Sequence, residues 1–143
     1  MRPVIHSVAL LAALFAAVLC LAPRPAAADG LTLELNKVED TPQGCLATVL
    51  IANGLGQALD RFRLDLVLFD GKGVVSDRLL IDLAPLPAER TTIANLPLHA
   101  GGCAGISRVL LRDIPACRGR QGRPQDCLTG LTVTTRTAID FGK

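Results

Sequence analysis

Apolar and polar residues alternate along much of the chain after residue 29, which is the pattern of half-buried β-strands. The clearest example is 62–69, where every second residue from Phe62 to Leu68 is apolar, whereas Arg63 and Asp65 lie on the opposite face. Clusters of turn-forming residues separate such segments about every ten residues, as in sandwiches and barrels. The pattern predicts no helix after Asp29. It predicts seven strands, at 31–38, 45–52, 62–69, 74–83, 91–98, 106–114 and 128–137, and therefore an all-β, immunoglobulin-like β-sandwich.

The segment 84–88 interrupts this alternation with two prolines, Pro85 and Pro87. Proline has no backbone N–H to donate to a neighbouring strand, so it is excluded from the interior of a sheet. We therefore expect 84–88 to be a crossover that carries the chain from one sheet to the other.

The first 28 residues follow a different pattern, that of a secretory signal peptide. Arg2 precedes an uncharged apolar run at 8–22, and the small residues 26–28 stand just before Asp29. The run is about 15 residues long, shorter than the ~20 residues of a membrane-spanning helix. We expect an N-terminal signal helix at 1–28 that is cleaved after Ala28, leaving an exported domain at 29–143, with an uncleaved anchor as the alternative. No Arg-Arg pair is present, which favours the general secretory route.

Cleavage changes the charge balance of the protein. The whole chain has 15 Lys and Arg against 13 Asp and Glu, and the signal segment removes Arg2 and Arg24, which leaves 13 of each sign. A neutral domain argues against nucleic-acid binding. Its aromatic residues are only Phe62, Phe69 and Phe141, so an aromatic platform for sugars or single-stranded nucleic acid is not predicted.

Four cysteines follow the predicted cleavage site, and an even number in a small exported domain indicates two disulfides. Three pairings are possible, of which we favour Cys45–Cys103 and Cys117–Cys127. The wide spacing of the cysteines and the single histidine after residue 28, His99, argue against a zinc site, and no C-x-x-C redox motif is present. No metal or other cofactor is predicted.

Two further groups of residues could carry chemistry. His99 could act with Cys103, if that thiol were free, or with Ser76 or Ser107, which would give a small Cys/His enzyme or hydrolase. A solvated loop histidine is the simpler interpretation, because no second member of a triad is recognisable. The Arg118, Arg120 and Arg123 side chains could bind phosphate or carboxylate groups, although a soluble charged loop has the same composition.

Three segments resemble a family of small exported α-proteobacterial proteins, usually labelled Tat pathway signal proteins of unknown function. They are 64–70, 83–92 and 106–113 with its flanking cysteines. The resemblance implies a periplasmic location and supplies no catalytic residues, and the missing twin arginines are a departure from the family label. The order of strands, the Asp70-Gly71 turn and the Leu-Pro segment also looks like FxLyD-type β-sandwich domains, where the proline segment precedes a strand of the other sheet.

The sequence thus predicts a non-enzymatic periplasmic accessory or adaptor protein that binds another envelope protein through exposed loops or edge strands. Binding of anionic lipid or lipopolysaccharide through the Arg118–Arg123 loop is one alternative. The small Cys/His enzyme is the other.

Overall fold

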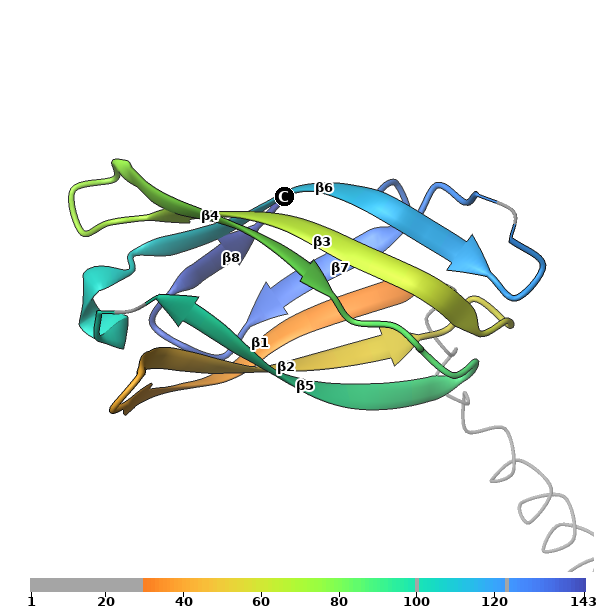
Figure 1. The fold of residues 1–143 in the computed structure, drawn as a ribbon, viewed down its shortest axis with the longest axis horizontal. Helices are drawn as coiled ribbons and strands as arrows, with labels where there is room; N and C mark the ends of the chain where they lie inside the picture. Colours follow the sequence, from red (N-terminus) through yellow and green to blue (C-terminus); the bar gives the residue numbers. More distant parts are fainter. Residues whose placement is uncertain (1–29, 100, 123) are drawn as a thin grey trace, which may run out of the picture.

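Two four-stranded β-sheets pack face to face in the computed structural model (Figure 1). The structure describes residues 30–99, 101–122 and 124–143, so the predicted signal peptide and Arg123 lie outside the described residues. The described part contains no α-helix, only a short 3₁₀ turn, η2 (Cys103–Gly105). The prediction of an all-β sandwich is therefore confirmed.

The first sheet has the strand order β5-β2-β1-β7 and the second has β4-β3-β6-β8. Neighbouring strands are antiparallel except for β1 with β7 and β6 with β8, which are parallel, so both sheets are mixed. The strands are β1 (Leu31–Thr41), β2 (Gly44–Asn53), β3 (Leu59–Phe69), β4 (Val75–Asp82), β5 (Arg90–His99), β6 (Arg108–Gly119), β7 (Leu131–Thr135) and β8 (Asp140–Gly142).

The strand predictions differ from the structure mainly near the C-terminus. The predicted strand 128–137 is confirmed only over the residues of β7, and β8 is an additional strand, which belongs to the other sheet. The Thr135 hydroxyl accepts a hydrogen bond from the Thr137 amide and donates one to the Ile139 carbonyl, both at 3.1 Å, and these local bonds form the turn between them. The predicted strand 106–114 also continues to Gly119. A shift in register between Arg63 and Asp65 accommodates Pro115 in this longer strand.

The core lies between the sheets and is built from the apolar faces that the alternation predicts. Phe62, Leu64, Leu66 and Leu68 on the central strand β3 are all no more than 1 % exposed. They pack in one cluster with residues of the facing sheet, including Leu33 of β1. Burying a large apolar side chain stabilises the fold by roughly 1.5–3 kcal/mol, so this alternation explains much of the sandwich's stability.

The crossover after β4 runs from the second sheet to the first, as predicted from its prolines. It is fixed by Asn53, whose side chain is buried at the end of β2. The Asn53 Nδ2 donates to the carbonyl oxygens of Gln57, Leu86 and Pro87 at 2.9, 3.2 and 3.2 Å, and its Oδ1 accepts from the Leu55 amide at 3.1 Å. One side chain therefore holds two loops together.

We expect the change Asn53→Ala to lower the free energy of unfolding by about 2 kcal/mol, because it removes the four hydrogen bonds by which this buried side chain joins the two loops. Urea denaturation monitored by circular dichroism measures this loss. Asn95→Ala is the matched control, since Asn95 makes one exposed bond to Thr48, and its effect should stay within about 0.5 kcal/mol. Equal losses in the two variants would contradict the role assigned to Asn53.

Candidate functional site

The four cysteines of the described domain lie in two pairs, Cys45 with Cys103 and Cys117 with Cys127, whose Cα atoms are 4.6 and 6.2 Å apart. This is the pairing that the sequence favours. The first pair joins the start of β2 to the turn that follows β5, and the second joins β6 to the segment before β7. Two pairs at bonding distance suggest an oxidising environment, such as that of an exported protein.

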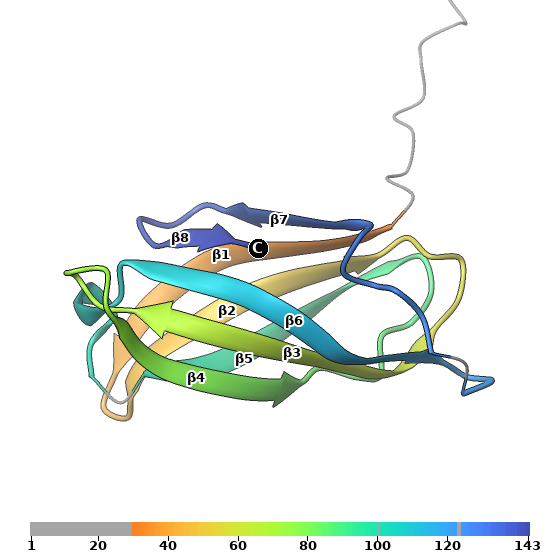
Figure 2. The same cartoon turned by 90° about the horizontal axis from the view of Figure 1, so that it is seen from above.

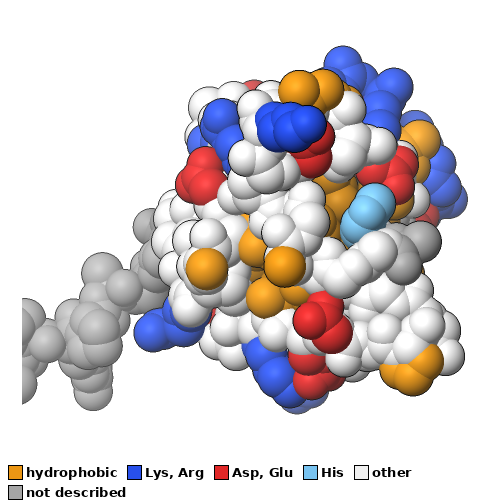
Figure 3. Space-filling view, turned by 90° about the vertical axis from the view of Figure 1, so that its left-hand side faces the viewer, with side chains coloured by type: hydrophobic (Ala, Val, Ile, Leu, Met, Phe, Trp, Pro, Cys, Tyr) orange, Lys and Arg blue, Asp and Glu red, His pale blue; other side chains and the backbone are white. Residues whose placement is uncertain are grey.

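His99 is the last residue of β5, where it lies opposite Cys45, so the prediction that it lies in a loop is wrong. Figure 3 shows this end of the sandwich, where apolar side chains gather near the centre of the view. Cys103 is bonded to Cys45 and is not the free thiol that a Cys/His enzyme needs. The Ser76 and Ser107 hydroxyls donate to backbone carbonyl groups, those of Leu68 and Asp70.

The two described arginines of the predicted loop lie in different elements. Arg118 belongs to β6 and lies opposite Arg61 of β3, whereas Arg120 follows in the turn and borders a hollow with Gln57 and Gln121. Both arginines are exposed. Because β6 continues to Gly119, the described part of this segment contributes to a sheet as well as to a turn.

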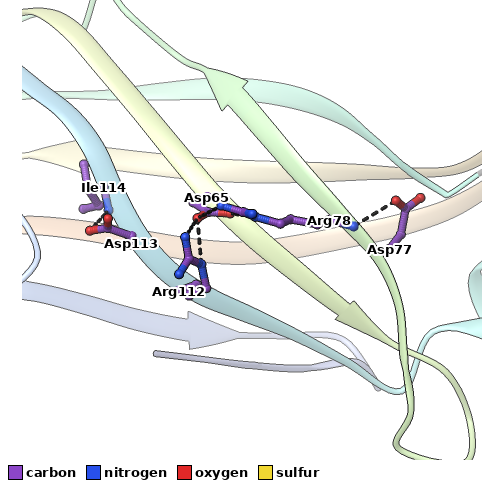
Figure 4. A network of polar contacts seen from close by, with 6 residues as sticks. All are labelled: Asp65, Asp77, Arg78, Arg112, Asp113 and Ile114. Atoms are coloured by element: carbon purple, nitrogen blue, oxygen red, sulfur yellow. Dashed lines mark hydrogen bonds and ion pairs between the residues drawn. The ribbon is translucent and has the colours of Figure 1, made fainter.

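A network that the sequence does not reveal surrounds Asp65 on the outer face of the second sheet (Figure 4). Arg78 of β4 donates from Nε and Nη2 to the two carboxylate oxygens, both at 2.8 Å. Arg112 of β6 approaches Oδ2 with its Nε at 2.8 Å and its Nη2 at 2.6 Å. Asp65 is only 1 % exposed, although alternation predicts an ordinary surface carboxylate there. That prediction is wrong because long side chains from both neighbouring strands cover the carboxylate.

The charge of this network is fixed. Hydrogen bonds from Arg78, together with those from Arg112, outweigh the effect of burial and lower the pKa of Asp65 to about 2. The carboxylate is thus ionised at any physiological pH and its oxygens are occupied by donors. Such a group is unsuited to proton transfer. Instead, it ties the edge strand β4 to the centre of its sheet.

The two long sides of the sandwich differ. On one side β7 and β8 contact each other (Figure 2). On the opposite side the edge strands β4 and β5 border a groove of about 710 Å³, lined by residues 79–85 and 92–97. Among these described lining residues only Asp82 is charged, and its Oδ2 lies 3.3 Å from Arg61 Nη2 and 3.7 Å from Arg63 Nη2. A volume of this size lies in the range of ligand-binding clefts.

Two exposed apolar side chains belong to the residues that border this groove. Within the described residues, the large apolar side chains recorded as exposed are Val74, Val75 and Leu80, each 58 % exposed, and Ile93, at 67 %. Leu80 pairs with Asp65 and Ile93 with Leu50, so both side chains lie on the outer faces of their sheets, at opposite rims of the groove. Leu79 and Ile81 of β4 face its interior. Single exposed apolar residues are common, but two of them at the rim of a groove with one charged lining residue mark a candidate binding surface.

The described residues contain no cluster of three or more side chains able to hold a metal ion. Nor does this part of the chain have a helix long and apolar enough to cross a membrane. Comparison with known proteins gives no family model, curated protein or solved structure that matches the chain. The groove between β4 and β5 is the candidate binding site of the described domain.

Proposed function

We propose that this protein is a non-enzymatic periplasmic accessory protein that binds another envelope protein in the groove between β4 and β5. The observation that carries the proposal is the open side of the sandwich, where two edge strands border a groove that is lined mainly by uncharged residues and has exposed Leu80 and Ile93 at its rim. Edge strands present unpaired backbone groups, which proteins normally protect or use for recognition.

The composition of the groove supports a protein partner. A soluble ionic ligand would need charged groups facing it, but the one charged lining residue, Asp82, is within ion-pair distance of Arg61 and Arg63. An apolar side chain entering the groove would be removed from water at a gain of about 25 cal/mol per Å² buried. Apolar segments of another chain provide such side chains.

Two other features belong to the same proposal. The export of the domain agrees with its paired cysteines, and the periplasm is the compartment implied by the family that the sequence resembles. An immunoglobulin-like classification is supported by the antiparallel pairs β2–β5 in the first sheet and β3–β6 in the second, because such sandwiches pair their second strand with the fifth and their third with the sixth.

We expect Ile81→Glu, a change at a residue of β4 that faces the groove, to reduce recovery of the partner at least about tenfold after cross-linking in intact host cells and purification of the tagged protein. A buried unpaired carboxylate in the groove would cost more than the ~1.4 kcal/mol that corresponds to a tenfold loss. Val74→Glu is the matched control, because it introduces the same charge just before β4 at a residue that does not line the groove. Quantitative mass spectrometry compares the two variants, and equal recovery from both would refute the groove as the binding site.

A further inference from the structure

The backbone of β5 presents free hydrogen-bonding groups in a defined order. Pro97 of β5 lies opposite Leu46 of β2, and proline is tolerated in a sheet where its nitrogen points away from the neighbouring strand. The groups of successive residues in an antiparallel strand point alternately toward and away from the neighbour. The register from Leu46 to Asn53 has no shift, so the N–H and C=O groups of Thr91, Ile93 and Asn95 also point outward.

The edge of β5 lacks the protection that β4 has. Within eight residues β4 carries three charges, Asp77, Arg78 and Asp82, and charged side chains discourage pairing at an edge. In β5 the residues from Thr91 to His99 carry no Lys, Arg, Asp or Glu. Only Pro97 would stop an added strand. The accessible edge is therefore the segment 91–95.

From this geometry we infer that the partner binds by adding an extended segment as a fifth strand beside β5. This inference rests on the proposed function and specifies how the groove is used. Alternate side chains of such a strand would point inward, over the groove and toward Leu79 and Ile81 of β4. The partner segment therefore needs large aliphatic residues at these alternate positions. We expect the partner segment to be uncharged over about five residues, which is the length of the free edge of β5.

A second copy of this chain fits the groove poorly. Self-pairing of β5 would direct its own inward residues, Thr92 and Ala94, toward the groove. These small side chains would leave most of the roughly 710 Å³ unfilled. The occupant is therefore a segment of another protein, with larger side chains at alternate positions.

The probe for this inference is a phage-displayed library of random twelve-residue peptides selected on the protein. We expect enriched peptides to carry Val, Ile, Leu or Phe at every second position across about five residues and no charge between them. Amide hydrogen exchange with a selected peptide should then slow at Thr91, Ile93 and Asn95, while Thr92 and Ala94, already bonded to β2, should change little. Enrichment of charged or non-alternating peptides, or unchanged exchange at the three outward amides, overturns the inference.

Two substitutions of Ile93 separate strand addition from simple apolar contact. Ile93→Pro removes an outward N–H and leaves the bonds to β2 intact, so peptide binding should fall at least about tenfold, the equivalent of about 1.4 kcal/mol. Ile93→Thr keeps the N–H and removes apolar surface, so binding should fall only severalfold. Loss in the threonine variant with retention in the proline variant overturns strand addition but leaves the proposed function standing. An Ile93→Pro-sensitive dimer in analytical ultracentrifugation, without peptide binding, also overturns the inference.

Discussion

Replacing Arg78 and Arg112 together with methionine should lower the free energy of unfolding by about 3–5 kcal/mol, because it leaves Asp65 buried without a cation. Methionine preserves much of the apolar length of each side chain, so the loss reports the missing charge and hydrogen bonds. Both arginines reach Asp65 from neighbouring strands, and Asp65 lies on the central strand β3. Loss of the network should therefore weaken the association of three adjacent strands, β4, β3 and β6.

The control for this variant is the double change Arg61→Met and Arg118→Met. These residues lie on the same sheet and the double change removes the same charge, but Arg61 pairs only with the partly exposed Asp82. Exposed ion pairs contribute about 0–1 kcal/mol, so urea denaturation of the control should show a small loss. A similar loss in both double variants would mean that Asp65 is not the reason for the instability.

The pH dependence of stability gives a second test of the Asp65 network. In the wild-type protein the pKa of Asp65 is about 2, below its ordinary value of 3.8, so its contribution is present above about pH 4 and is lost as the pH falls toward 2. Without the two arginines, burial raises the pKa of Asp65 instead. The contribution of Asp65 to the pH dependence of stability should then reverse its sign, so that protonation of Asp65 makes the double variant more stable as the pH falls. Denaturation between pH 2 and 7 measures both slopes.

The sequence predicts the core well because each strand repeats one simple rule. Alternation identifies the buried side of β3 from Phe62 to Leu68, and proline chemistry identifies the crossover at 84–88. Both properties depend on neighbouring residues in the chain. The same rule wrongly predicts that Asp65 is a surface carboxylate, because its burial depends on Arg78 and Arg112, which lie 13 and 47 positions further along the chain.

The groove could not be predicted from the sequence for the same reason. Leu79, Leu80 and Ile81 form a short apolar run that breaks strict alternation, and this was the signal available in the sequence. A run of this kind is equally typical of a strand buried on both faces. Only the sheet order places β4 and β5 at open edges, and sheet order depends on pairings between distant segments. The sequence therefore predicts edge strands as binding surfaces but not which edges are available.

Removing the Cys45–Cys103 bond by changing both residues to alanine should cost about 4 kcal/mol, more than the roughly 3 kcal/mol expected for Cys117–Cys127. The reason is the length of chain that each bond closes in the unfolded state, since the paired residues are 58 and 10 positions apart. A small domain is stable by only about 5–15 kcal/mol, so the first loss is a large fraction of the total. Urea denaturation of the two double-alanine variants provides the comparison.

The two bonds should also differ in their effect on binding. The Cys45–Cys103 bond holds the turn after β5, and β5 is the strand to which we assign the partner. Its loss should speed amide exchange at the end of β5 near Leu98 and weaken peptide binding, whereas loss of Cys117–Cys127 should leave β5 unchanged. A larger loss of stability in the Cys117 and Cys127 variant would contradict the chain-length argument. Faster exchange of β5 in that same variant would instead show that the two ends of the sandwich are coupled.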